Sequence, residues 1–349
     1  MKRKPNRVTS HVVAKLAGVS QPTVSRAFTP SASIAKDKRD RVLAAAKHLN
    51  YLPNSIASSL SKAHSNIVAV IVGDMNNPFY AESLEVFINR LQATGRQVLV
   101  FSIADGRDCD DVLMRALRYH VDGVVVTSAH LSSDLVSLSQ GVGIPITLFN
   151  RSTADHALNS VLCNSITGSE ILAQAMHDAG ARRYLIVRGD PQGSTSRNRV
   201  KGFRDKLESL AVLPEAIEEI DGGSSYSGAF DTISQKFAGE GIQRPDAIFA
   251  VNDIMAMGCA DALRDVFKLR IPEDVMLAGF DGIRPAQLAA YQLTTIRQPI
   301  EEMVEKTLEL LDQTSTTDDD DDEKDQITQT DHLLTGTFVP GKTVPGTNV

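Results

Sequence analysis

The sequence predicts an α/β protein, with a small all-α head followed by a two-lobed body of doubly wound parallel sheets. The first part of the chain, up to residue 53, shows helical patterns and no strand pattern. From residue 66 onward, short apolar runs alternate with amphipathic helical stretches, which is typical of βαβ units. The alternation begins again near residue 165, so we expect two similar halves with a cleft between them.

The charge of the chain is divided unevenly along its length. All 349 residues together carry a formal net charge of −7, but residues 1–62 hold twelve Lys and Arg against two acids. That segment therefore carries +10, and the rest of the chain carries −17. A basic head on an acidic body indicates a head that binds the phosphates of a nucleic acid.

Residues 8–28 predict two short helices joined by a tight turn. Thr9 can cap a first helix over Ser10–Ala17, and Ser20 can cap a second helix with Pro22 in its first turn. Polar side chains are left on the outer face of the second helix: Gln21, Thr23, Ser25 and Arg26. The pattern predicts a helix-turn-helix that reads the major groove; an ordinary helical hairpin with a solvated face is the alternative.

A third helix, expected over residues 36–49, would complete the head. Residues 54–62 can then form a short helix that begins at Asn54 and is rich in serine. Because nine residues are too few for a stable isolated helix, we expect this segment to become ordered only on a partner.

The body is predicted from its alternating strands and helices. We expect strands at residues 67–72, 97–103, 123–127, 146–149, 184–188, 247–251, 276–280 and 333–339. Between them we expect helices near residues 80–94, 109–119, 131–140, 165–179, 197–210, 254–267 and 300–311. The acidic run at 318–322 is expected to be a solvated, disordered loop.

Several classes of protein are disfavoured by the sequence. Cys109, Cys163 and Cys259 are far apart, so we expect reduced, buried thiols and neither a metal site nor a disulfide framework. The charged N-terminus lacks the apolar stretch of an export signal, and no run approaches the roughly 18–20 apolar residues of a membrane span. A cytoplasmic location is therefore expected.

One motif is expected to be misleading. Gly336, Gly341, Lys342 and Thr343 satisfy the pattern GxxxxGK[ST] of a phosphate-binding loop. Such a loop needs a helix after it to hold the phosphates, and too few residues follow to form one. We expect a turn at this place, and no nucleotide cofactor.

The order of these parts resembles the LacI/GalR family of bacterial transcription regulators, over nearly the whole chain. Five stretches carry the resemblance: residues 8–28, 49–60, 251–258, 279–282 and 293–300. The body is also similar to periplasmic pentose-binding proteins, notably in the MNNPFY run at 75–80. The resemblance implies a helix-turn-helix domain at 1–53, a hinge helix and linker at 54–65, and an effector-binding and dimerisation domain at 66–349. Its N-lobe would comprise 66–163 and 296–328, and its C-lobe 164–295 and 329–345.

The resemblance also implies a homodimer on a pseudo-palindromic operator. Because no leucine heptads follow Leu333, we expect a dimer rather than a coiled-coil tetramer. Gln21, Pro22 and Arg26 match the base-reading positions, and the guanidinium fork of Arg26 suits guanine. Thr23 and Ser25 would contact phosphates. The expected DNA-binding set also includes the capping residues and the hinge helix, whose leucine would wedge into the minor groove: Thr9, Ser20, Asn54, Ala57 and Leu60.

The expected effector site comprises planar polar groups and aromatic rings near strand ends. Its members are Asn77, Phe79, Tyr80, Asn150, Arg151, Arg199, Asn252, Asp281 and Gln298. Such groups suit a sugar, whose hydroxyls both donate and accept hydrogen bonds. The resemblance implies the same positions except Tyr80, which would add stacking. A nucleobase is an alternative ligand. The structural alternative is that Asn150 and Asn252 are helix caps and that Arg199 and Asp281 form an ion pair bridging the lobes.

The function expected from these observations is repression of carbohydrate transport or catabolism genes, with release by a small sugar. No nucleophile–base pair is visible, so we do not expect an enzyme. A co-repressor mechanism, in which the ligand promotes DNA binding, is an alternative. A cytosolic solute-binding protein and a nucleotide-using enzyme are rival classes, but the basic head argues against the first and the missing phosphate loop against the second.

Overall fold

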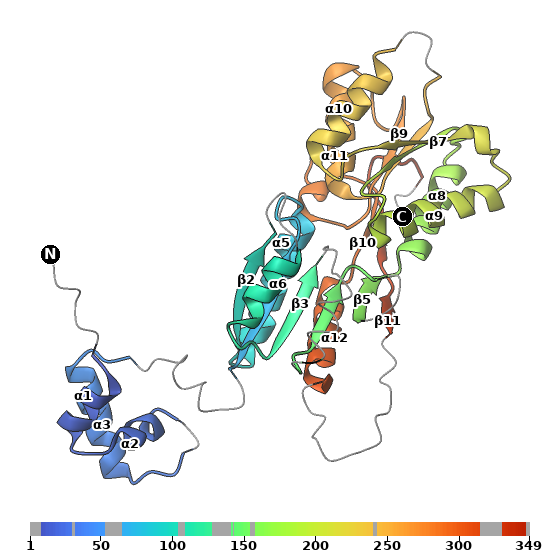
Figure 1. Ribbon diagram of the computed structural model, residues 1–349. Helices are drawn as coiled ribbons and strands as arrows, with labels where there is room; N and C mark the ends of the chain where they lie inside the picture. Colours follow the sequence, from blue (N-terminus) through green and yellow to red (C-terminus); the bar gives the residue numbers. More distant parts are fainter. Residues whose placement is uncertain are drawn as a thin grey trace, which may run out of the picture. The chain divides into compact units, whose positions relative to one another are not determined.

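The computed structural model describes residues 8–29, 32–52, 65–103, 109–127, 141, 143–153, 158–239, 243–314 and 330–346. The chain divides into two compact units, Met1–Asn66 and Ile67–Val349, which we call the head and the body (Figure 1). The hinge residues expected to contact DNA, Asn54, Ala57 and Leu60, lie outside the described residues, as do the predicted helix at 131–140 and the acidic run at 318–322.

The head consists of α1 (Ser10–Ala17), α2 (Gln21–Ala27) and α3 (Lys36–His48). Small apolar side chains from all three helices form its core: Val13, Ala14, Ala17, Val24, Ala27, Val42, Ala45 and Ala46. Gly18 ends α1 with φ 62°, the left-handed conformation that the tight turn requires. The head is therefore the three-helix unit that the sequence predicts.

The expected caps of the head helices are only partly confirmed. Thr9 and Ser20 occupy the N-cap positions of α1 and α2, but neither side chain accepts a hydrogen bond from the first turn. The hydroxyl of Ser20 instead lies 2.8 Å from that of Thr23. Both residues thus start a helix by their extended backbone rather than by their hydroxyl groups.

The first lobe of the body is built on a six-stranded parallel sheet. Its order is β11 (Asp331–Leu334), β5 (Asn159–Cys163), β4 (Ile146–Phe149), β3 (Gly123–Thr127), β1 (Ile67–Val72) and β2 (Gln97–Ser102). β1 is a continuous apolar run because both of its faces are covered. Val68 and Val70 face the core below α5 (Pro78–Ala93) and α12 (Ile300–Thr314), while Ala69 and Ile71 face α6 (Cys109–Leu117).

The second lobe has a four-stranded parallel sheet in the order β7 (Ile217–Asp221), β6 (Tyr184–Arg188), β8 (Ala247–Ala250) and β9 (Met276–Ala278). Helices α8 (Ser165–Asp178) and α9 (Ser194–Ser209) pack together on one face. Helices α10 (Tyr226–Phe237) and α11 (Asp253–Asp261) cover the other face (Figure 1). Parallel strands in both lobes direct their carboxyl ends to loops where a ligand can bind.

The last strand predicted from the sequence is in fact two strands in different sheets. β11 joins the six-stranded sheet beside β5, whereas β12 (Thr337–Val339) pairs antiparallel with β10 (Thr295–Arg297). The expectation that 329–345 belongs to the second lobe is therefore wrong for β11. An apolar pattern marks a strand but does not say which sheet the strand joins, and this caused the error.

Gly336 separates these two strands where the chain crosses between the lobes. A Cβ atom at this position would lie 2.5 Å from Ile296 Cγ2 and 3.0 Å from Cys163 Sγ. Burial raises the pKa of the Cys163 thiol to about 11, so it is protonated at neutral pH. The crossing segments are thus packed so closely that only glycine fits between them.

The phosphate-loop match contains β12 and then a turn. Thr343 is buried, and its hydroxyl accepts a hydrogen bond from the backbone N–H of Thr294 at 2.9 Å. The motif residue that would bind a metal in a phosphate loop is thus part of the internal packing. Among the helices of the described ranges, we find none with the length and apolar character needed to cross a membrane.

Candidate nucleic-acid interface and ligand cavity

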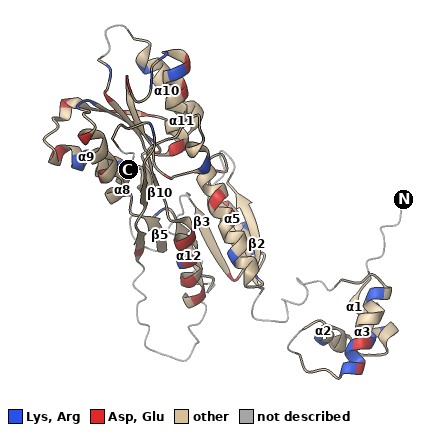
Figure 2. Ribbon diagram, turned by 180° about the vertical axis from the view of Figure 1, so that it is seen from behind, with Lys and Arg blue, Asp and Glu red and all other residues tan. Residues whose placement is uncertain are grey.

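The outer face of α2 is polar and open to solvent. Gln21, Pro22, Ser25 and Arg26 are exposed and Thr23 is half-buried, whereas Val24 is only 1% exposed on the opposite face. The Gln21 side chain donates from Nε2 to the Ser10 hydroxyl at 3.0 Å, which positions it at the N-terminal end of α2. Each of the three head helices carries Lys or Arg residues (Figure 2). The exposed face of α2 thus presents groups that can read bases, among them the cation of Arg26.

The body contains a cavity of about 210 Å³ lined by residues of both lobes. Seven of the residues proposed from the sequence line it: Asn77, Tyr80, Asn150, Arg151, Arg199, Asn252 and Asp281. Asn77 precedes α5, Asn150 and Arg151 follow β4, and Asn252 follows β8. The cavity therefore lies at the carboxyl ends of the strands, where α/β sheets bind ligands.

Arg199 and Asp281 form a buried ion pair that lines the cavity. Arg199 Nη2 lies 2.9 Å from Asp281 Oδ1, and Nη1 donates to the carbonyl oxygen of Val251 at 2.6 Å. The guanidinium carbon lies 3.9 Å from the centre of the Phe280 ring, so the cation also contacts an aromatic face. Both charged residues belong to the second lobe, and the expectation that their ion pair bridges the lobes is wrong.

Asp281 is nevertheless connected to the first lobe. Its carboxylate accepts hydrogen bonds from the side chain of Asn77, which precedes α5, and from Gln298 Nε2 at 2.8 Å. Its φ of 131° is unfavourable for a residue with a side chain, which indicates that the carboxylate is held in place by its partners. Burial raises the pKa of Asp281, and the nearby Arg199 charge opposes that shift.

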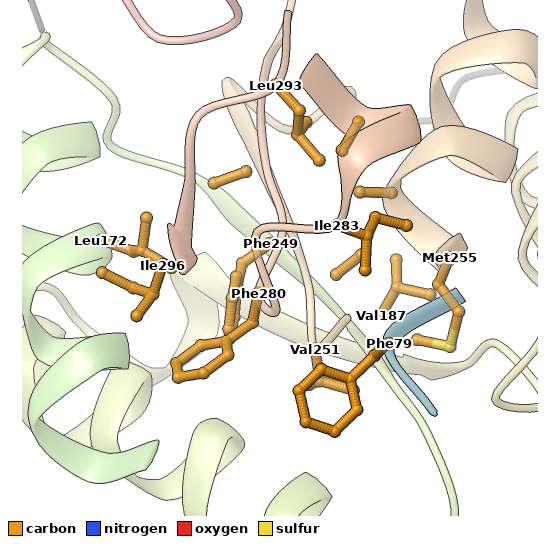
Figure 3. Packing of buried hydrophobic residues seen from close by; sticks show 14 of the residues in the cluster. Phe79, Leu172, Val187, Phe249, Val251, Met255, Phe280, Ile283, Leu293 and Ile296 are labelled. Atoms are coloured by element: carbon orange, nitrogen blue, oxygen red, sulfur yellow. The ribbon is translucent and has the colours of Figure 1, made fainter. Parts of the chain in front are cut away.

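Two of the proposed residues do not line the cavity. Phe79 is 1% exposed and belongs to the apolar core with Val251, Met255 and Phe280 (Figure 3). Its ring centre lies 5.2 Å from that of Tyr80, so Phe79 supports the ring that does line the cavity. Gln298 is buried behind Asp281 and orients that carboxylate. Sequence spacing cannot distinguish these supporting positions from the lining ones.

The asparagines of the cavity have different structural roles. Asn252 caps α11 by accepting from Met255 N at 2.9 Å, as the structural alternative expected, and Asn77 caps α5 by accepting from Phe79 N at 3.0 Å. Asn150 is not a cap. It is 4% exposed with φ 58°, and its Oδ1 atom has no hydrogen-bond partner among the described residues. A buried acceptor of this kind favours a ligand that donates a hydrogen bond.

The loop after β6 provides cavity residues that the sequence analysis missed. Asp190 Oδ2 lies 3.3 Å from Arg151 Nη2, and the Ser194 hydroxyl accepts from Ser152 N at 3.1 Å. Each contact joins the two lobes beside the cavity. The missed lining residues of this loop and of the start of α9 are Gly189, Asp190, Gly193, Thr195 and Ser196. Those that follow other strands are Gly73, Asp74, Ser224 and Val251. The run GDPQG directly after an apolar strand is the signal that could have identified this loop.

A second buried carboxylate lies behind the cavity. Asp253 accepts from the Thr295 hydroxyl at 2.6 Å and from Ile283 N at 3.0 Å. Burial, together with the nearby Asp281 carboxylate, raises the pKa of Asp253 to about 7. Among the described side chains, no group of three or more potential metal ligands occurs. The cavity thus presents paired charges, amides and hydroxyls, which can bind a polar ligand by hydrogen bonds.

Comparisons with known proteins agree with both parts of this description. Residues 11–54 match the bacterial regulatory proteins of the lacI family, and residues 173–344 match the periplasmic binding protein-like domain. The HTH-type transcriptional regulator DegA of Bacillus subtilis is 30% identical over 304 residues, which cover 85% of this chain and 88% of DegA. The ribose operon repressor of Escherichia coli K12 is 28% identical and matches 86% of this chain and 90% of its own.

The fold is also that of a solved repressor. A crystal structure of the Lac repressor dimer bound to operator and an anti-inducer superimposes with a TM-score of 0.83. The match covers 97% of this chain and 99% of the other, at 24% identity. The similarity extends over the head and the body alike.

Proposed function

Because this chain belongs to the LacI family of bacterial regulatory proteins, we propose that it represses carbohydrate genes and leaves its operator when a small sugar enters the cavity. It is a DNA-binding transcriptional regulator and not an enzyme. The proposal concerns the finer points: the sugar, the type of target gene, the homodimer and the sign of the response.

One observation carries the sugar proposal. The Asn150 Oδ1 atom is buried without a partner in the cavity, next to amides and charged groups that can accept from or donate to a ligand. A sugar hydroxyl can donate to this oxygen and accept from a neighbouring donor at the same time. Tyr80 also lines the cavity, and its aromatic ring can contact the C–H groups of a sugar. The relative named a ribose operon repressor supports a carbohydrate as the ligand class.

The DNA-binding proposal rests on the exposed face of α2. Arg26 has a planar fork of donors that fits guanine, and Gln21 can pair with adenine in the same groove. Two heads in a homodimer would read the two halves of a pseudo-palindromic operator. The segment at 54–65 would form the hinge, with Leu60 inserted into the minor groove at the centre of the operator.

The mechanism that we infer is a coupling between the cavity and the DNA. A sugar that contacts both lobes favours a closed cavity, and closure would move the first lobes of the dimer so that the two hinge segments no longer meet on DNA. Such coupling is reciprocal, so bound operator lowers the affinity for the sugar by the same factor.

The test is a selection of genomic fragments with the purified chain, without ligand and in moderate salt. We expect one palindromic site to be enriched beside genes for carbohydrate transport or catabolism, and a sugar of that pathway to reduce binding. Enrichment only after a small molecule is added would favour a co-repressor instead. If no fragment is enriched under either condition, the assignment of Gln21, Pro22 and Arg26 to base reading is wrong.

A further inference from the structure

We propose that Asp190 determines the specificity of the cavity by occupying the position that an anionic group of a ligand would take, so that the effector is an uncharged, hydroxylated molecule. This inference rests on the proposed function, because it concerns the ligand of the same cavity. It predicts that neutral sugars bind and that phosphorylated sugars and sugar acids do not.

The first argument is the position of the Asp190 carboxylate at the start of α9. Helix N-termini attract anions because their first backbone N–H groups lack helical partners, and three residues at this end, Gly193, Thr195 and Ser196, line the cavity. The Asp190 carboxylate lies just before this end, because it accepts at 2.9 Å from Gln192 N, two residues ahead of α9, and a Cβ atom at the N-cap residue Gly193 would lie 3.5 Å from its Oδ2. The protein thus places its own anion beside the helix end to which an anionic group of a ligand would be attracted.

The second argument concerns the two guanidinium groups that line the cavity. Arg151, whose side chain is only 11% exposed, lies 3.3 Å from Asp190, and Arg199 lies 2.9 Å from Asp281. Each cation therefore already has a carboxylate partner from the chain itself. An anionic ligand would have to displace one of these carboxylates, which would leave a partly buried carboxylate without its cation.

The third argument is the balance of charge in the cavity. The lining includes three carboxylates, of Asp74, Asp190 and Asp281, against the guanidinium groups of Arg151 and Arg199. Additional negative charge in this enclosed space would be repelled. The buried Asn150 Oδ1 also calls for a donor, which a sugar hydroxyl supplies and an ionised phosphate oxygen does not.

Asp190 is held in this position by contacts other than its ion pair. Its backbone N–H donates to the Ser224 hydroxyl at 2.7 Å, and Ser224 itself lines the cavity. The loop therefore keeps its place when the side chain is changed to a neutral one of equal size. Asp190→Asn removes the charge while preserving shape, and it converts the start of α9 and Arg151 into a site that is open to anions.

The experiment measures calorimetric binding of inorganic phosphate to the full chain and to three variants. Asp190→Asn is the test, Asp190→Asn with Arg151→Gln is the reversal, and Glu208→Gln is the control, since Glu208 is an exposed acid at the far end of α9. We expect Asp190→Asn to tighten phosphate binding roughly ten-fold or more, as a newly freed charge-assisted contact would. The unchanged chain and Glu208→Gln should bind phosphate equally weakly, and Arg151→Gln should remove the gain.

D-ribose and D-ribose 5-phosphate form a second, matched pair of probes. Preference of the unchanged chain for the phosphorylated sugar would overturn the proposal, and so would phosphate binding that Asp190→Asn leaves unaltered. If melting shows that Asp190→Asn is unfolded, Asp190→Ser takes its place with the same expected gain. The genomic selection and the phosphate titration test the two proposals separately. If no operator is found but Asp190→Asn gains phosphate binding, the regulator proposal is refuted while the role of Asp190 in the cavity is supported.

Discussion

Arg284 of the second lobe donates its backbone N–H to the Glu82 carboxylate of the first lobe at 3.0 Å. The guanidinium of the same residue lies 3.2 Å from Glu85 Oε2, one helical turn further along α5. Neither acid lines the cavity, so this contact joins the lobes at a place separate from the ligand. It is a polar connection between lobes that the sequence analysis did not anticipate.

Removing this connection should weaken ligand binding without unfolding the body. The Arg284 side chain is 73% exposed, so water screens the pair and its contribution is about 0–1 kcal/mol. We expect Glu82→Ala with Glu85→Ala, which removes both acceptors, to raise the sugar concentration needed for half-maximal operator release by up to about five-fold, since closure loses that contact. Fluorescence anisotropy of labelled operator checks this; an unchanged midpoint would show that the contact does not affect closure.

Breaking the buried ion pair should have a far larger effect on stability. Asp281→Asn leaves the buried Arg199 guanidinium without a countercharge, and the expected loss is about 3–5 kcal/mol in the free energy of unfolding. Urea denaturation of the full chain measures it. Asp274→Asn is the matched control because it breaks an exposed pair with Arg270, and its effect should be much smaller. Equal losses in the two variants would contradict the assignment of a structural role to the buried pair.

The stability of the body should decrease as the pH rises from about 4 to about 7, through Asp253. Its folded-state pKa is raised to about 7 against an ordinary value of 3.8, so over this range the native state keeps a proton that the unfolded chain has released. Higher pH therefore favours unfolding until the native carboxyl also ionises. Asp253→Asn cannot ionise, and urea denaturation across this range should show that it lacks this part of the decline. A variant with the same pH profile as the unchanged chain would refute the assignment.

Substitutions on α2 should separate base reading from phosphate binding. Arg26→Ala should lose about 1–3 kcal/mol of discrimination at one base pair of the operator and tolerate other bases there. Ser25→Ala, one residue away on the same exposed face, should weaken binding evenly across sequences because a phosphate contact carries no base information. Binding to a set of operators with single base changes distinguishes the two. A uniform loss for Arg26→Ala would place its side chain on the backbone instead.

The strands that the sequence predicted best are those buried on both faces. The run at Ile67–Val72 is apolar throughout because helices cover both sides of β1, so its bounds were evident. β7 was missed because the run IEEID is partly exposed and carries three acids at the edge of its sheet. β5 was missed because NSVLC begins with the polar residues Asn159 and Ser160, which leaves an apolar run of only three residues. Both strands therefore contain polar residues that the complete fold accommodates, β7 at the edge of its sheet and β5 between two other strands.

The cavity was predictable as far as its residues follow strand ends. Asn77, Asn150 and Asn252 stand directly after apolar runs, so topology alone brings them together. Asp190 also follows a strand, but its role depends on a partner in the other lobe, Arg151, and sequence order does not reveal such a distance. Phe79 was proposed as a cavity residue because it stands beside Tyr80 in the sequence. Its side chain is buried in the core instead, and sequence position does not reveal this orientation.

The placement of β11 has a consequence for the order in which the protein assembles during synthesis. The strands β1 to β5 are made early, but α12 and β11, which complete the same lobe, are made only after the four-stranded sheet of the second lobe. The edge of β5 that pairs with β11 therefore stays unpaired while more than a hundred further residues are added to the nascent chain. The head can fold as soon as its own helices emerge, and so a nascent chain would hold a finished head well before it holds a finished first lobe.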